Sequence, residues 1–182
     1  MNSNLVRYTN PAIAFHWLIA LLIFATFPLG LYMQDLPLSP DKLKLYSWHK
    51  WIGITILMLA SLRLLWRVSH KPPPLIEAMP RWQKLSSQMV HLLLYVLIFA
   101  IPISGWVMSS AKGFQTIWFG VLPLPDLVGK DKALGEVLTE VHKTLNFTML
   151  ALIFLHVAAA LKHHWIDRDT NLRRMLPFAK GS

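Results

Sequence analysis

Four histidines lie within or beside long apolar stretches of this chain: His16, His49, His142 and His156. An ionisable ring in such a stretch is costly, and neutral imidazole is a common ligand of metals and of haem iron. The chain has no cysteine, which excludes disulfides, thiolate metal sites, iron–sulfur clusters and covalently attached c-type haem. The chemistry to consider is therefore ligation by histidine, and it depends on where folding places these rings.

The composition indicates a membrane protein. Of the 182 residues, 54% are hydrophobic and 15% are charged, whereas soluble domains average about 45–50% and about 25%. A hydrocarbon core about 30 Å thick takes about 20 helical residues to cross. Stretches of that length cover residues 11–33, 48–66, 85–109 and 142–164. We therefore expect an all-α membrane protein, in which residues 1–182 form a single domain, a bundle of four transmembrane helices.

The loops predict the orientation of this bundle. Basic residues prevail before the first span, between the second and third, and after the fourth, whereas the other two connections are balanced. The positive-inside rule then places both termini in the cytoplasm and accounts for the net charge of +9 without a nucleic-acid partner. The first span is too long for a signal-peptide core and lacks a cleavage site, so we expect it to be retained. The residues concerned are Arg7, Arg63, Arg67, Lys71, Arg81, Lys84, Lys162, Arg168, Arg173, Arg174 and Lys180, against Glu77, Asp167 and Asp169.

Depth along the spans pairs the four histidines. His142 and His156 are 14 residues apart, a spacing that returns to within about 40° of the same helix face about 21 Å further along. His49 lies at the outer depth and His16 at the inner depth, each on a different span. We predict an inner pair, His16 with His156, and an outer pair, His49 with His142. Each pair could bind the iron of one haem b from both axial sides.

Alternatives remain for each histidine. Any single one could be a satisfied packing residue, as we expect for His91, and His70 is expected to be only a loop residue. A zinc site is the main rival, although zinc would usually recruit cysteine or a nearby carboxylate. Small residues such as Gly53 and Gly105 would leave room for a flat macrocycle between helices.

Basic residues near the ends of the second span could pair with haem propionates. Arg63 follows His49 by 14 residues, so it lies on the same face at the inner depth, where arginine could bind a propionate in a bidentate manner. Lys50 and Lys143 could do the same at the outer depth, or could simply reach the membrane surface. The segment from Lys112 to Asp131 contains proline and glycine, and we expect an irregular loop on the outer membrane surface.

Four segments resemble the bacterial cytochrome b561 family: "FHWLIALL", "WHKWIGITILMLASLRLLWR", "YVLIFAIPISGWVMSS" and "LHVAAALKHHWIDRDTNLRRM". The last is the most specific, because a histidine, a run of small residues, a double histidine and a basic tail occur together. The resemblance extends over essentially the whole chain. It implies a four-helix bundle in the bacterial inner membrane, with two b haems held by His16, His49, His142 and His156.

The resemblance also implies an activity. One branch of the family oxidises superoxide at the outer face and passes the electron to ubiquinone, near the inner haem and the double histidine. That quinone site corresponds here to His163 or His164, which could instead be interfacial anchors. The implied partners are membrane lipid, quinone and a small electron donor. Lysines on the outer side could steer an anion, although nearby acids cancel their charge.

Two other functions remain open. The chain could be the haem-bearing membrane subunit of a larger dehydrogenase or hydrogenase complex, although its short loops offer little surface for a protein partner. It could also be a channel or scaffold, which would need no buried histidine pairs and would purify colourless. The favoured interpretation is a dihaem oxidoreductase that connects an outer donor, such as superoxide, to the quinone pool.

Overall fold

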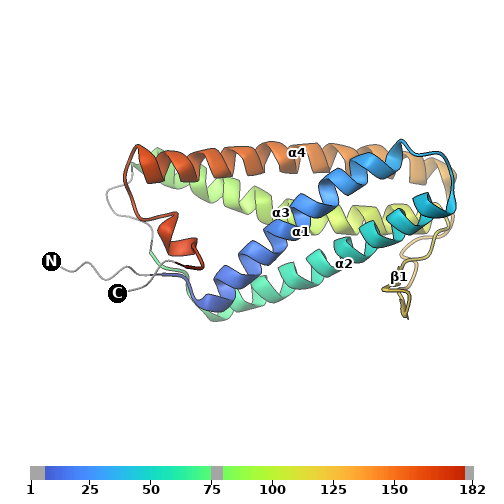
Figure 1. Cartoon of the computed structure of the whole chain (residues 1–182), viewed down its shortest axis with the longest axis horizontal. Helices are drawn as coiled ribbons and strands as arrows, with labels where there is room; N and C mark the ends of the chain where they lie inside the picture. The colour runs from blue at the N-terminus through green and yellow to red at the C-terminus, as the bar shows by residue number, and fades with distance from the viewer. Residues whose placement is uncertain (1–6, 75–79, 179–182) are drawn as a thin grey trace.

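The computed structural model describes residues 7–74 and 80–178. Four long helices run along its long axis, and α1 crosses the others obliquely (Figure 1). All four are long and apolar enough to cross a membrane, which confirms the predicted four-helix membrane fold. They are α1 (Asn10–Gln34), α2 (Pro40–Ser69), α3 (Arg81–Ala111) and α4 (Lys132–Trp165).

Two of these helices begin well before the predicted spans, because capping residues start them in the polar loops. The Ser39 hydroxyl accepts a hydrogen bond from Lys42 N at the start of α2, and the Asp131 carboxylate accepts one from Leu134 N at the start of α4. His49 and His142 therefore lie nine and ten residues inside their helices, where regular backbone geometry holds them.

The connection between α3 and α4 is more regular than the sequence predicted. It contains an antiparallel hairpin of β1 (Ile117–Trp118) and β2 (Leu122–Pro123), in which Trp118 pairs with Leu122. The turn uses positive φ at Phe119 (50°) and at Gly120 (73°). Glycine adopts that conformation freely, whereas phenylalanine rarely does. Strands of two residues have too little alternation to be recognised in a sequence.

The core lies midway along the bundle. Its buried side chains come from all four helices: Ile19, Ile56, Ala60, Leu97, Ile98 and Met149. Large apolar side chains such as Leu21 and Phe154 are exposed on the outside of the bundle, as expected for helices surrounded by lipid rather than water.

Both described ends of the chain lie at one end of the bundle. Arg7 Nη2 donates to the carbonyl of Leu176 at 2.8 Å, close to the short 3-10 helix η1 (Arg173–Met175). Arg174 Nη1 donates to the carbonyl of Pro74 at 2.7 Å, which joins the tail to the connection between α2 and α3. The hairpin lies at the opposite end (Figure 1). Glu77 and Lys180, which entered the charge argument, lie outside the described residues.

Candidate functional site

The structure brings the four histidines together as two pairs at two depths. The ring centres of His16 on α1 and His156 on α4 are 6.3 Å apart. The ring centres of His49 on α2 and His142 on α4 are also 6.3 Å apart. The ring planes cross at 69° in the first pair and at 77° in the second. Helix α4 thus contributes one ring to each pair, and two different helices supply the partners.

This separation suits two imidazoles that bind one metal ion from opposite sides. A metal–nitrogen bond of about 2 Å, plus about 1 Å from that nitrogen to the ring centre, gives about 6 Å when doubled. Direct packing of two rings allows about 4.5–7 Å, so the distance alone permits either arrangement. The surroundings of the outer pair bear on the choice between these two arrangements.

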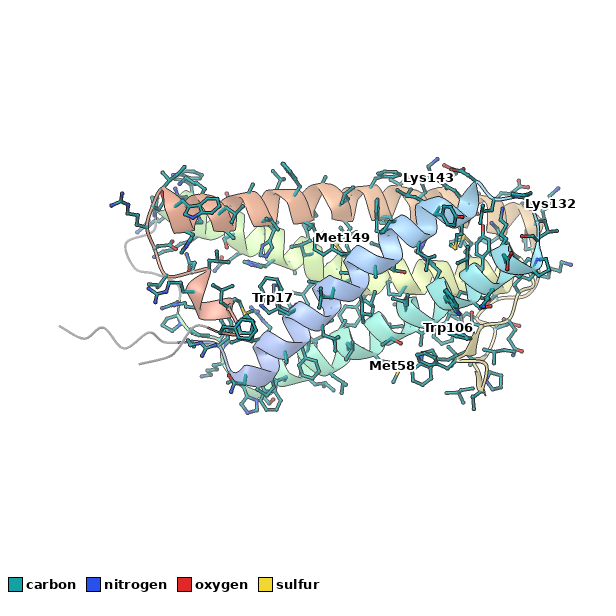
Figure 2. All side chains as sticks on the ribbon, in the orientation of Figure 1. Trp17, Met58, Trp106, Lys132, Lys143 and Met149 are labelled. Atoms are coloured by element: carbon teal, nitrogen blue, oxygen red, sulfur yellow. The ribbon has the colours of Figure 1, made fainter. Side chains whose placement is uncertain are left out.

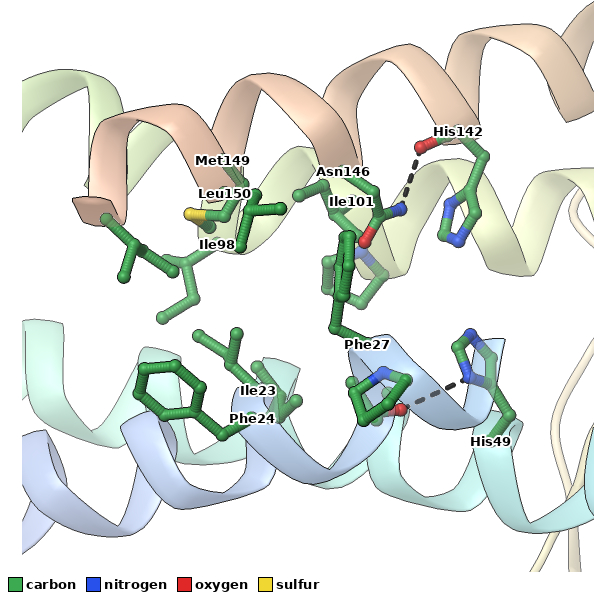
Figure 3. A pocket seen from close by; sticks show the side chains of 16 residues that line it. Ile23, Phe24, Phe27, His49, Ile98, Ile101, His142, Asn146, Met149 and Leu150 are labelled. Atoms are coloured by element: carbon green, nitrogen blue, oxygen red, sulfur yellow. Dashed lines mark hydrogen bonds between the residues drawn. The ribbon is translucent and has the colours of Figure 1, made fainter. Parts of the chain in front are cut away.

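A cavity lies beside the outer pair and is lined by side chains of all four helices. Figure 3 shows His49 and His142 facing each other at one end of this cavity, with Ile98 and Met149 toward the other end. Apart from the two rings, Thr26 and Asn146, its lining is apolar, and Asn146 Nδ2 donates to the carbonyl of His142 at 2.7 Å. The apolar lining and the two facing imidazoles match the chemistry of a haem, whose ring is flat and apolar and whose iron takes an imidazole nitrogen on each axial side.

Two prolines lie within helices beside this cavity. Pro28 lies inside α1 and Pro102 inside α3, and both line the cavity. A proline within a helix lacks the N–H that would bond the carbonyl four residues earlier, and its ring displaces that turn. Each of these helices therefore lacks one backbone hydrogen bond beside the outer pair.

Hydroxyl groups orient the outer imidazoles. Ser104 Oγ donates its only proton to the carbonyl of Ile101 at 2.8 Å and lies 2.9 Å from Nδ1 of His142. With the Ser104 proton on that carbonyl, Nδ1–H of His142 would donate to Oγ, and the unprotonated Nε2 would be free to bind a metal. On the other side, Thr26 Oγ1 lies 3.2 Å from Nδ1 of His49. The sequence analysis missed both hydroxyl residues.

Two glycines allow the outer rings to lie against neighbouring helices. A Cβ atom at Gly105 would lie 3.0 Å from Cε1 of His142, and one at Gly30 would lie 3.0 Å from Cε1 of His49. Gly105 was expected to make room for a macrocycle, but it accommodates the ligand ring itself. Gly53 lines the cavity and has nothing within 4 Å of the corresponding position.

The inner pair has different neighbours. The ring centre of His91, on α3, is 5.1 Å from that of His156, and the ring centre of Trp17 is 5.4 Å from that of His16. Within the described residues, neither His16 nor His156 makes a ring hydrogen bond. We expected His91 to be a satisfied packing residue, and this stays a prediction; its place beside the inner pair was not anticipated. Its position six residues into the third span places it at nearly the depth of His16, so the depth rule could have found it.

Two arginines of α2 lie near the inner pair. The guanidinium carbons of Arg63 and Arg67 are 5.2 Å and 5.5 Å from the ring centre of Tyr95. Arg63 is close enough to His16 and His156 for its charge to act on both rings. Neither arginine pairs with a carboxylate in the described part of the chain. The predicted inner depth of Arg63 therefore agrees with its surroundings.

The double histidine lies at the end of α4. His163 Nδ1 is 2.7 Å from an oxygen of Asp167, which also pairs with Lys162. Hydrogen bonding from Lys162 lowers the pKa of the Asp167 carboxyl and keeps it charged. His164 Nδ1 is buried and has no hydrogen-bond partner among the described residues. Nδ1 of His163 likewise makes no hydrogen bond of good geometry. The two rings differ in that His163 faces carboxylates, whereas His164 faces none among the described residues.

Comparisons with known proteins indicate the family of this chain. Residues 7–178 match a family model described as prokaryotic cytochrome b561. "Cytochrome b561 homolog 2" of Escherichia coli (strain K12) is 37% identical over 171 residues, which are 93% of this chain and 91% of that protein. "Probable superoxide oxidase CybB" of Yersinia pestis is 28% identical over 180 residues, 96% of this chain and 98% of that protein.

A third relative, "Cytochrome b561 homolog 1" of Escherichia coli (strain K12), is 28% identical over 185 residues, which are 96% of this chain and 99% of that protein. The family match covers nearly all of the described residues, including all four helices and both histidine pairs. It implies a b-type haem and electron transfer within a membrane. This multi-pass membrane protein belongs to the prokaryotic cytochrome b561 family.

Proposed function

We propose that this chain binds two b haems and carries electrons across the bilayer, from an outer donor such as superoxide to ubiquinone. The main support is that two histidine pairs at different depths of α4 have the same ring separation of 6.3 Å. A single structural histidine would need no partner, and chance packing would not be expected to repeat one separation at both depths.

Each residue would have the following role in this proposal. His49 and His142 would hold the outer haem, and His16 and His156 the inner one. Each haem, when bound, supplies a one-electron carrier. Ser104 would accept from Nδ1–H of His142 and so leave Nε2 free for the iron, and the apolar lining of the cavity would exclude water. Arg63 is a candidate partner for a propionate of the inner haem because it has no carboxylate partner within the described residues.

The orientation follows from the basic residues at one end of the bundle. The tail, the start of α1 and the connection between α2 and α3 meet there. The positive-inside rule assigns this end to the cytoplasm and the hairpin to the outer side. The membrane would then be the bacterial inner membrane.

Two observations support superoxide as the electron donor: the name of one relative, and the positive charge near the outer histidines. The name of the Yersinia pestis relative is "Probable superoxide oxidase CybB". Lys50 and Lys143, next to the outer histidines, add positive charge where a small anion would arrive. Two superoxide ions each lose one electron to become two O2, and one ubiquinone takes up both electrons and two protons to become ubiquinol.

The acceptor site is proposed at the double histidine. His164 has a buried ring nitrogen without a partner in the described residues, and it could hydrogen-bond a quinone carbonyl. His163 would help to position His164, because the ring of His163 is held close to the Asp167 carboxylate.

The test combines a haem count with an electron-transfer assay. We expect the purified protein to contain two b haems per chain by reduced-minus-oxidised absorbance. In vesicles that contain ubiquinone, an outer source of superoxide should produce ubiquinol. His70→Ala is the matched control, because His70 stacks on Trp66 at 3.9 Å, away from both pairs, and should change neither result.

The outcomes separate the candidate functions. A colourless protein, expressed with sufficient haem, would reject the dihaem proposal and favour a channel or scaffold. Two haems without superoxide-dependent ubiquinol would reject superoxide as the donor. A stoichiometric protein partner, retained through purification and required for reduction of the haems, would favour the subunit of a larger complex.

A further inference from the structure

The hairpin finger, defined here as residues 114–125, has an unusual surface for an extramembrane loop. The sequence from Gly113 to Pro125, "GFQTIWFGVLPLP", contains no charged residue. At its tip Phe119 is 54% exposed, Val121 84% and Leu122 52%. Loops that face water are usually polar, and a cluster of exposed large apolar side chains marks a contact with something other than water. Figure 1 shows the finger beside α2 at one end of the bundle.

The finger lies at the level of the membrane span and not beyond it. Trp51 Nε1 donates to the carbonyl of Ile117 at 2.6 Å, and Trp118 Nε1 donates to Thr55 Oγ1 at 3.3 Å. Trp51 and Thr55 belong to the charge-free run from Trp51 to Leu62 of α2. Those 12 residues rise only about 18 Å, less than a hydrocarbon core of about 30 Å. The span must therefore include the whole run, so β1 lies beside the end of the span.

The backbone of the finger can tolerate a low-polarity environment because its polar groups are largely paired. Gly120 N donates to the carbonyl of Ile117 and Val121 N to that of Trp118. Leu124 N donates to the carbonyl of Thr116, and Gln115 Nε2 donates to the carbonyl of Leu124. Unpaired backbone groups are what normally exclude loops from the edge of a membrane.

The aromatic residues of the finger have the composition and location of an interfacial anchor. The ring of Phe119 lies 5.3 Å from that of Trp51 and 4.9 Å from that of Trp118. Tryptophan is enriched where a membrane protein crosses the lipid headgroup region, since its ring is apolar and its N–H can still hydrogen-bond. Both indole groups here do so, and Val121 and Leu122 beside Phe119 remain exposed at the tip.

We propose that the hairpin finger inserts its tip, Phe119, Val121 and Leu122, into the interfacial region of the lipid bilayer. The lipid is favoured over a protein partner because the finger is continuous with the lipid-facing surface of α2. This anchor bears directly on the outer pair. Lys50, next to His49, donates to Ser109 Oγ and to the carbonyls of Phe114 and Gln115. The membrane contact thus fixes the depth of the segment that carries His49. The proposal needs only that the helices span a membrane.

The test uses the absence of native cysteine. Val121→Cys, labelled with a nitroxide in phosphatidylcholine vesicles, carries the only label in the chain. Leu21→Cys on α1, 64% exposed, is the lipid control. Lys132→Cys is the water control, because the side chain of Lys132 is 93% exposed and lies at the same end of the bundle (Figure 2). Power saturation measures collisions with oxygen, which favours lipid, and with a neutral nickel chelate, which favours water.

We expect the ratio of oxygen to nickel accessibility at position 121 to be several-fold higher than at position 132, and to approach that at position 21. A ratio equal to that at position 132 would overturn the proposal, because the finger would then face water. Low accessibility to both reagents would also overturn it, because a second copy or another protein would then cover the tip. The readout does not require haem, so its failure is distinct from failure of the proposed function.

Discussion

The outer and inner histidine pairs have the same ring separation but differ in what holds the rings. At the outer pair, Ser104 and Thr26 bond the Nδ1 atoms, and two glycines let the rings lie against α1 and α3. At the inner pair, the described residues supply no ring hydrogen bond; instead His91 lies against His156 and the charge of Arg63 acts on both rings.

This difference suggests that hydrogen bonds act on the outer histidines, whereas a nearby charge acts on the inner ones. Hydrogen bonds at the outer site hold the orientation of each ring, which favours a rigid site. A nearby positive charge at the inner site favours the state that carries one more electron. Electrons would then be drawn from the hairpin end toward the tail end. Five substitutions, grouped in four tests, would probe this contrast.

Removal of one ligand should have the largest effect. His142→Ala should abolish the outer haem and leave the inner one, so that the purified protein keeps about half of its haem. His16→Ala should give the reciprocal loss, which low-temperature difference spectra would distinguish. Loss of both haems in each variant, with a helical circular dichroism spectrum retained, would contradict two independent sites.

A larger residue at Gly105 should have the second-largest effect. A Cβ there already meets Cε1 of His142 at 3.0 Å, so the branched side chain of Gly105→Val should push the ring away and strongly reduce binding of the outer haem. Gly129→Ala is the control, because nothing lies within 4 Å of its added carbon. Haem content measured by the pyridine haemochrome method would check this. Unchanged content in Gly105→Val would mean that the His142 ring is not held against α3 in the loaded protein.

Removal of a hydroxyl partner should have a moderate effect on the outer site alone. Ser104→Ala removes the acceptor of His142 Nδ1–H, and loss of such a second contact typically weakens metal binding by about 10–100-fold. The outer haem should be lost more readily to apomyoglobin and should shift in midpoint potential. Ser61→Ala, which removes only a bond to the carbonyl of Leu57, should change neither. An effect confined to the inner haem would refute the assigned role.

Neutralisation of one arginine should have the smallest effect, confined to the inner site. Arg63→Gln should lower the midpoint potential of the inner haem, by about 59 mV for each tenfold change in its reduction equilibrium. Arg67→Gln is the matched comparison, because Arg67 also lies over Tyr95 but its charge is not among those that act on His16 and His156. A spectroelectrochemical titration would resolve both. Equal shifts in the two variants would mean that only the total charge matters.

The helical membrane fold could be predicted because lipid leaves a chain few options. A backbone inside a bilayer must satisfy its own hydrogen bonds, so long apolar stretches become helices, and four of them form a bundle. The capped helix starts at Ser39 and Asp131 extended α2 and α4 beyond the apolar stretches, because capping acts on the polar residues outside the membrane. The small hairpin was missed because its stability comes from contacts with Trp51 and Thr55 of another helix.

The sequence by itself determined the depth of each histidine along its helix. The rise of an α-helix is constant, so the 14 residues between His142 and His156 place them at two levels of one face whatever surrounds them. The tertiary structure decided which side chains meet at each level, since that depends on how each helix is rotated and how it crosses its neighbours. Those crossings bring Ser104 and Gly30 to the outer rings, and His91 to the inner pair. No spacing along a single helix encodes them, because packing between helices sets their rotation.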